Sequence, residues 1–215
     1  MSDIRLAPRV TPAAVTADQG YMAVQGFRDG SISVATFKQR MAAAGRLFTA
    51  NMGSVTTPLT FLVTAANRPD AWVRVPSGTA IMPVYAGVTL ESAAGTVTEI
   101  DVRIAQNDIG NGTSTAASVG PVSQRTDAPV TSNCTARHLA TADTTAETNP
   151  LSIYRRTYAR ADEAGIDWRG IEKDFEPSPL LIGAATWEIF IAATTTQATG
   201  FVVMSWIETP SNWWT

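Results

Sequence analysis

The feature that most constrains the fold is an alternation of apolar and other residues that recurs along most of the chain. Its longest run places apolar side chains at every second position, at Met82, Val84, Ala86, Val88 and Leu90. Successive side chains of a β-strand point to opposite faces, so this spacing predicts a strand with one buried face. Shorter runs with the same period occupy residues 59–65, 71–75, 99–104 and 151–159.

Turn residues separate these runs at short intervals. The separators contain Pro69, Pro76, Gly78 and Gly95. Further apolar runs at residues 180–183, 187–193 and 201–207 bring the total to about eight strands. Strands of this length, bounded by turns at short spacing, predict an all-β sandwich or barrel.

The strand predicted at residues 187–193 is apolar on both faces. Trp187, Ile189 and Ile191 fall on one side, and Phe190 falls on the other. A strand of this kind is buried on both faces, so its second face must meet a loop or a second subunit. The run at residues 201–207 has the same character. We expect the subunit interface to include Phe190, Trp206, Trp213 and Trp214.

The first fifty residues follow a different pattern. Residues 1–30 contain prolines and isolated apolar residues without periodicity, which predicts an extended arm. Residues 33–44 predict a short helix, because Val34, Phe37 and Met41 fall on one helical stripe. Ser33 is the expected cap of this helix and Gly45 its expected end. We therefore divide the chain into an arm with a helix, residues 1–50, and a β-sandwich, residues 51–215.

Residues 107–149 form a long excursion rich in Thr, Ser, Ala, Asn and Gly. Weak edge strands are expected within it at residues 119–122 and 134–139. A segment of this length without structure of its own is uncommon in a compact domain, and such segments commonly carry binding or assembly contacts. The excursion is also the alternative cover for the second face of the C-terminal strands.

The chain contains one cysteine and one histidine, Cys134 and His138. A disulfide within the chain, a dithiol centre and a zinc site of several Cys and His ligands are therefore excluded. A Cys–His catalytic pair is the less favoured interpretation, because such partners normally come from separate elements. We expect no enzymatic activity, no cofactor and no metal.

Carboxylates gather between residues 162 and 176, which raises the alternative of a glycosidase with two catalytic acids. Arginines and Lys173 are interleaved with these acids, and this mixture is more typical of a solvated, ion-paired surface. The net charge of −3 argues against a general nucleic-acid partner. No apolar segment is long enough to span a bilayer or to act as a signal peptide, so no membrane partner is expected.

Aromatic residues outside the expected core indicate a second kind of surface. Tyr154, Arg156 and Tyr158 alternate along one predicted strand as an outward set, and Trp168 lies in the charged segment after it. Aromatic rings anchor subunit contacts and also stack on sugars. This set is therefore either a glycan-binding face or a subunit contact, or else a solvated face with Arg lying over Tyr rings.

Two segments carry a resemblance to a known class of proteins. VPSGTAIMPVYAGVTLE (residues 75–91) and ATWEIFIAATTTQATGFVVMSWIE (residues 185–208) resemble parts of the single jelly-roll capsid and decoration (cement) proteins of viruses and tailed bacteriophages. The second segment is similar to the terminal hairpin of trimeric jelly rolls. The similarity covers about residues 58–208, and the excursion at 107–149 departs from a minimal jelly roll.

The resemblance implies a jelly-roll-like β-sandwich that acts by assembly. The expected function is that of a capsid, cement or decoration subunit, a homotrimer that also contacts other capsid proteins. Such a subunit is made in the host cytoplasm and ends at the outer capsid surface of the virion. The alternative is a receptor- or carbohydrate-binding jelly-roll module, such as a spike or fibre head, with a glycan as its partner.

Overall fold

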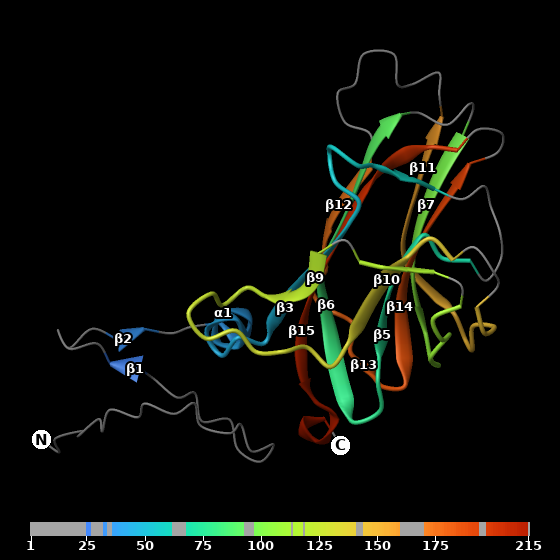
Figure 1. Cartoon of the computed structure of the whole chain (residues 1–215). Coiled ribbons are helices and arrows are strands. Elements are labelled where there is room, and N and C mark those ends of the chain that lie inside the picture. The colour runs from blue at the N-terminus through green and yellow to red at the C-terminus, as the bar shows by residue number, and fades with distance from the viewer. Residues whose placement is uncertain are drawn as a thin grey trace, which may run out of the picture.

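The computed structural model describes residues 25–26, 32–33, 36–61, 68–92, 97–112, 114–117, 119–140, 144–159, 170–193 and 197–214. Strands dominate, and the two large sheets are antiparallel and face each other (Figure 1). The predicted all-β sandwich is confirmed. The predicted arm at residues 1–30 falls outside the described residues, apart from the short strand β1 (Gln25–Gly26), which pairs with β2 (Ile32–Ser33).

One sheet has six strands and the other has seven. The six-stranded sheet has the order β11 (Leu151–Ala159), β7 (Val97–Ala105), β14 (Ala185–Ala193), β5 (Ala71–Val75), β10 (Thr135–His138) and β8 (Thr115–Ala116). The seven-stranded sheet has the order β12 (Gly170–Asp174), β6 (Thr79–Ser92), β15 (Thr199–Pro210), β3 (Leu47–Met52) and β9 (Val119–Ser123). Its two further strands are β13 (Leu181–Ile182), which pairs with β6, and β4 (Leu59–Thr60), which pairs with β15.

The connectivity of the main strands is that of a jelly roll. Taken in chain order, these eight strands are β3, β5, β6, β7, β11, β12, β14 and β15, and they pair as a folded ribbon: β3 with β15, β5 with β14, β6 with β12 and β7 with β11. Wrapping the ribbon brings β15 beside β6 and β14 beside β7. Two sheets formed in this way are the jelly-roll arrangement. The total strand count exceeds eight because short strands are added at the sheet margins.

Two of the eight main strands are absent from the sequence prediction. β3 starts at Leu47, so the sandwich begins before the predicted boundary at residue 51. Its core residues Phe48, Ala50 and Met52 do alternate, but the run is short and directly follows the helix. The residues of β12 were predicted to lie in a charged segment without a strand. β12 is an edge strand, and charges are common on edge strands because they discourage pairing with other chains.

A glycine fixes the start of β12. The backbone of Gly170 has a φ of 143°, and a Cβ there would lie 1.8 Å from the carbonyl oxygen of Val88. Only a residue without a side chain can approach the neighbouring strand so closely.

The longest alternation in the sequence serves two different clusters. Ala86, Val88 and Leu90 face the sandwich core, whereas Met82 and Val84 lie on the outer face of the same sheet. The change of face occurs at a register shift, where Ser205 and Trp206 of β15 oppose Tyr85 and Pro83. A bulge of this kind inserts an extra residue and moves the following side chains to the other face.

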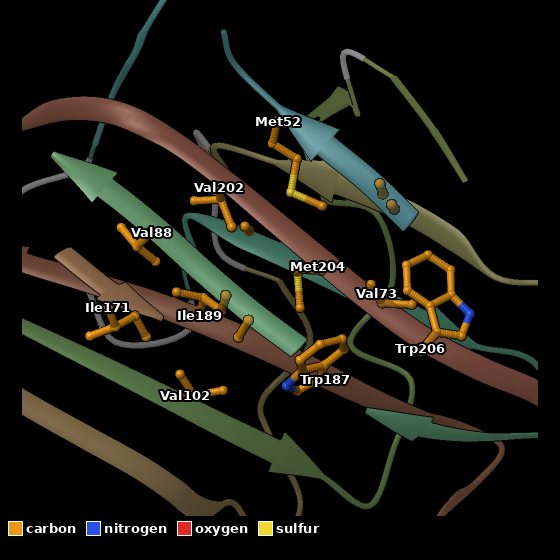
Figure 2. Close-up of a cluster of buried hydrophobic side chains, with 14 of the residues drawn as sticks. Met52, Val73, Val88, Val102, Ile171, Trp187, Ile189, Val202, Met204 and Trp206 are labelled. Atoms are coloured by element: carbon orange, nitrogen blue, oxygen red, sulfur yellow. The ribbon is translucent and has the colours of Figure 1, made fainter. Parts of the chain in front are cut away.

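The sandwich core lies between the two sheets (Figure 2). Trp187, Ile189 and Ile191 face this core, as predicted, and they are at most 1% exposed. On β15 the core set consists of Val202, Met204 and Trp206, each fully buried. The ring of Trp206 stacks on Phe48 of the neighbouring β3, with centroids 6.2 Å apart.

One helix, α1 (Phe37–Ala43), covers part of the outer face of the seven-stranded sheet. It is shorter than predicted and begins at a capping box, in which Thr36 rather than Ser33 accepts from the Gln39 amide. The predicted end is confirmed: Gly45 has a φ of 74°, a conformation that suits glycine at the end of a helix. Met41 packs on Val84 and Ile207 of the sheet below.

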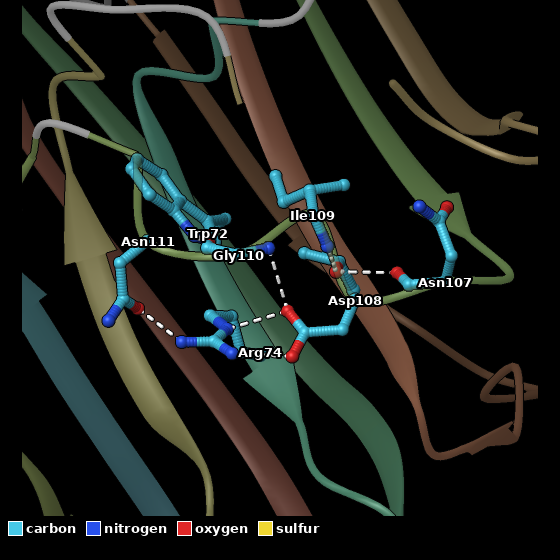
Figure 3. Close-up of polar contacts among 8 residues, drawn as sticks. Trp72, Arg74, Asn107, Asp108, Ile109, Gly110 and Asn111 are labelled. Atoms are coloured by element: carbon cyan, nitrogen blue, oxygen red, sulfur yellow. Dashed lines mark hydrogen bonds and ion pairs between the residues drawn. The ribbon is translucent and has the colours of Figure 1, made fainter. Parts of the chain in front are cut away.

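Part of the excursion packs on the outer face of the six-stranded sheet, over β5 and β14 (Figure 3). Ile109 packs on Trp72 of β5, and Asp108 forms an ion pair with Arg74, with 2.6 Å between Oδ1 and Nε. Thr186 of β14 donates its hydroxyl to the carbonyl of Asn107 at 2.8 Å. The expected edge strands within the excursion are β9 and β10, although β10 is interior because β8 lies beyond it.

The core assignment of Trp206 has a measurable consequence. Trp206→Ala removes a fully buried indole and leaves a cavity, so it should lower the free energy of unfolding by about 3–5 kcal/mol. Urea denaturation followed by circular dichroism measures this change. Val55→Ala is the control, because Val55 is 74% exposed and its loss should change stability by no more than about 0.5 kcal/mol. Equal effects of the two substitutions would contradict the core assignment.

Candidate assembly surface

Three large aromatic side chains are exposed beside one another near the end of the chain. Phe37, Trp213 and Trp214 are 37%, 40% and 38% exposed, and the guanidinium of Arg46 lies over the ring of Trp213 at 5.3 Å. We call these four residues the C-terminal aromatic patch. Trp213 and Trp214 were predicted from the sequence as interface residues, whereas Phe37 and Arg46 were not.

The strand β15 and the short 3-10 helix η2 (Ser211–Trp213) hold the patch in place. The Ser211 amide donates to the carbonyl of Gly78 at 2.9 Å, which fastens the end of the chain to the turn before β6. The indole Nε1 of Trp214 donates to the hydroxyl of Thr209 at 2.8 Å. Its ring meets that of Phe37 edge to face, with centroids 6.3 Å apart. The aromatic side chains are therefore ordered before any partner arrives.

The helix α1 contributes one ring to the patch. Phe37 is the first residue of α1, and the packing of Met41 on the sheet fixes the helix there. The start of α1 therefore lies next to the patch. In Figure 1, α1 lies beside β3, and the C-terminus follows the end of β15.

The structure removes two residues from the predicted subunit interface. Trp206 is wholly inside the sandwich core, where its period-two neighbours place it. Phe190 does point to the outer face of the six-stranded sheet, but it is only 8% exposed because the guanidinium of Arg103 lies over its ring at 4.4 Å. The expected second face is thus covered within one subunit, by Arg103 and by the excursion.

The predicted outward set on β11 is wrong for Tyr154, which is half-buried against the core, whereas Arg156 is exposed to solvent at the sheet edge. Tyr154 lies opposite Val102 and Arg156 opposite Ile100, and both partners belong to the core. Directly opposed residues of antiparallel strands share a face, so Tyr154 and Arg156 lie on the core-facing side of β11. A register shift at residues 152–154 places them there. The side chain of Tyr158 and all of Trp168 lie outside the described residues.

Tyr154 has a structural contact that explains its half-buried position. The ammonium of Lys173, on β12 of the other sheet, lies 5.5 Å from the centre of the Tyr154 ring. The two strands are at the same open edge of the sandwich, so this cation–π contact closes the edge between the sheets.

Cys134 and His138 do not form a catalytic pair. A strand rises by about 3.3 Å per residue, so four residues of extended chain separate them by about 13 Å. Cys134 is buried beside Glu208, which accepts from the Asn133 amide at 2.8 Å and from the Ser132 hydroxyl. Burial foremost, and then the charge of Glu208, raise the pKa of the Cys134 thiol. Burial lowers the pKa of His138, which favours the neutral imidazole.

Part of the predicted acidic cluster at residues 162–176 lies outside the residues that the structure describes, because these do not include residues 160–169. Glu172 and Asp174 lie on β12, opposite Gly87 and Tyr85. Burial, followed by the charges of Glu172 and Asp174, raises the pKa of Tyr85. Within the described ranges, no group of three His, Cys, Asp or Glu side chains is arranged to hold a metal ion. The helices of the described part are too short and too polar to cross a membrane.

Comparisons of the chain with protein-family models, with curated proteins and with solved structures returned no match.

The environment of Cys134 predicts an inert thiol. At pH 8 the native protein should not react with a disulfide reagent such as dithionitrobenzoate, because burial and Glu208 oppose formation of the thiolate. Unfolding in guanidinium should release one reactive thiol per chain. Val55→Cys, which places a thiol at a 74% exposed position, is the positive control and should react in the native state. Rapid native reaction at Cys134 would show that this side chain is accessible.

Proposed function

We propose that the protein is a structural subunit of a viral particle, a capsid, cement or decoration protein that acts by assembly. In this proposal the C-terminal aromatic patch is the anchor of a contact between copies, most simply in a homotrimer. No catalytic step is involved. The subunit would stand at the outer surface of the particle, among other capsid proteins.

The jelly-roll connectivity supports this class without deciding it. Capsid proteins, lectins and cupins all use double-sheet jelly rolls, so the function depends on the surface that the fold presents. The excursion covers part of the outer face of the six-stranded sheet, and α1 covers part of that of the seven-stranded sheet. The observation that carries the proposal is the exposed aromatic patch beside α1.

The patch has the chemistry of an interface anchor. Trp, Tyr and Arg dominate the residues that carry binding energy at protein interfaces, and they are most effective when their orientation is fixed in advance. Trp214 is fixed by Thr209 and Phe37, and Trp213 lies under Arg46.

The size of the patch indicates that it is the centre of a larger contact. Three rings of about 150–250 Å² at these exposures present roughly 200–300 Å². A standard interface hides about 800 Å² on each partner. The remaining area would come from the surroundings of the patch, including α1, where Lys38 and Gln39 are also exposed. Repetition of such contacts through a shell multiplies their effect.

The glycan-binding alternative has less support. Its proposed platform required Tyr154 and Arg156 to face outward together, but Tyr154 is half-buried against the core and only Arg156 is exposed. Binding to a glycan array at micromolar concentration, with no self-association, would favour this alternative over assembly.

Disruption of the patch provides the test. The full chain at tens of micromolar should scatter light as an oligomer, and Trp213→Asp should shift it to the monomer, because a carboxylate cannot be buried in an apolar contact without a partner. Size-exclusion chromatography with multi-angle light scattering measures the mass.

The matched control is Val55→Asp, which adds the same charge at an exposed position in the turn at residues 54–57 and should leave the mass unchanged. Near-ultraviolet circular dichroism confirms that both variants are folded. A wild-type chain that stays monomeric, or a Trp213→Asp variant that keeps the wild-type oligomeric mass, would reject the proposed contact.

A further inference from the structure

A buried carboxylate lies at the centre of the six-stranded sheet, beneath the excursion. Glu188 belongs to β14, between Arg103 of β7 and Trp72 of β5. Its side chain is fully buried, and among the described residues its carboxyl oxygens have no hydrogen-bond partner other than the carboxyl group of Glu147. An isolated charge in such a place is costly enough that a carboxyl group normally takes up a proton instead.

The group that meets Glu188 is a second carboxyl group. Glu147 belongs to the excursion, its side chain is only 7% exposed, and its Oε2 has no donor among the described residues. Its other oxygen, Oε1, lies 3.6 Å from Nη1 of Arg103. Two carboxyl groups in contact are stable when they share one proton and repel when both are charged.

The charges around the pair of glutamates favour a state in which the pair holds one proton. Asp101, with a side chain 4% exposed, receives hydrogen bonds from Arg103 at 2.6 Å and from Arg155 at 2.8 Å. The two guanidinium groups therefore face three buried carboxyl groups, those of Asp101, Glu147 and Glu188. One proton shared by the last two makes this cluster neutral, whereas its loss leaves an uncompensated buried negative charge.

Other charged groups near this face are already engaged. They are Arg74 with Asp108, Arg137 with the hydroxyl and carbonyl of Ser114, Asp70 with the amide of Ile191, and the more exposed Glu99 with Arg155. Each of these side chains has a partner, and Glu99 shares Arg155 with Asp101 at the exposed margin of the cluster.

We propose that Glu147 and Glu188 form a proton-sharing pair that holds the excursion against the outer face of the six-stranded sheet, and that loss of the shared proton detaches residues 144–149. The proton goes to solvent, and no other bond is made or broken. The proposal concerns one subunit and stands whether or not the subunits assemble.

The direction of the pH effect follows from the pair. Burial, the charge of Glu147 and the hydrogen bond with Glu147 raise the pKa of Glu188 to about 9, while Arg103 opposes the shift. An opened excursion returns both groups to water, where a glutamate has a pKa of about 4.3. The closed form therefore keeps a proton that the open form releases, and the excursion becomes easier to open as the pH rises between these values.

Two amides of the excursion report on its attachment. The Thr145 amide donates to the carbonyl of Ile109 at 2.9 Å, and the Thr148 amide donates to the side chain of Asn107 at 2.6 Å. Both donors are on the segment that carries Glu147, and both acceptors are on the segment that covers Trp72 and Thr186. Detachment of residues 144–149 breaks both hydrogen bonds.

The experiment measures hydrogen exchange of these two amides in the full chain from pH 5 to pH 10, as protection factors corrected for the intrinsic rate. Loss of one proton on opening should lower the protection by up to about ten-fold per pH unit, levelling off above about pH 9. Amides between β3 and β15 in the other sheet should not follow this slope.

Two variants should remove the slope. Glu188→Gln cannot ionise, and its amide donates to Glu147. Glu147→Gln leaves two carboxylates against two guanidinium groups, so the cluster is neutral without a proton. In either variant the protection factors of the two amides should change by no more than about two-fold between pH 5 and pH 10. If Glu188→Gln does not fold, Glu147→Gln provides the test. Glu172→Gln, at an exposed position on the β12 edge, should retain the wild-type slope.

Protection in the wild-type chain that does not change between pH 5 and pH 9 would overturn the proposal. A slope that persists in both glutamine variants would do the same, because another group would then be titrating.

Discussion

The structure depends on the burial of both faces of β14. Every side chain from Ala185 to Ile191 on this strand is withdrawn from water, including the hydroxyl of Thr186 and the carboxyl of Glu188. One face fills the core between the two sheets, and the other requires a third layer. Much of that layer is the excursion, which is held by the Trp72–Ile109 contact, by the Arg74–Asp108 ion pair and by Thr186. The excursion is therefore an integral part of the fold.

The two outer faces of the sandwich are covered in different ways. The six-stranded sheet carries charged and aromatic residues outward, and the excursion supplies matching polar partners. The seven-stranded sheet carries Val84, Ile207 and Leu47 outward, and α1 covers them with Met41. The ring of Phe37 at the start of this helix and the rings of Trp213 and Trp214 remain partly exposed. That difference places the proposed contact between subunits on one side and the proposed proton-sharing pair on the other.

The strand pattern was readable because period two survives in most of the main strands. The core set of β14 follows directly from it, and so does the all-β class, whereas both faces of β15 are apolar and the pattern did not decide which one is the core face. Prediction failed where the apolar alternation was short, as in β3, and where charged residues dominated the strand, as in β12. It also failed where a register shift moved side chains to the other face, as at Val84 on β6 and at Tyr154 on β11. Shifts of this kind depend on the partner strand, which local sequence does not specify.

The residues of the candidate sites also fall into those that the sequence could identify and those that it could not. Trp213 and Trp214 could be identified from their position after the last strand, because no strand remained to bury them. Phe37 and Arg46 could not, since they reach the patch only through the docking of α1. Glu188 was visible in the sequence as an interruption of an apolar run, yet its partner Glu147 is 41 residues away in the chain.

The sequence by itself determined that β14 needs cover on two faces, because its apolar residues occur at both odd and even positions and side chains alternate. It also determined that no disulfide within the chain could supply the stability, since there is one cysteine. Only the tertiary structure decided what provides the cover. A face of a strand can be buried equally well by a loop, a helix or a second subunit. The choice depends on which distant segments pair, through contacts such as Arg103 over Phe190 and Ile109 over Trp72.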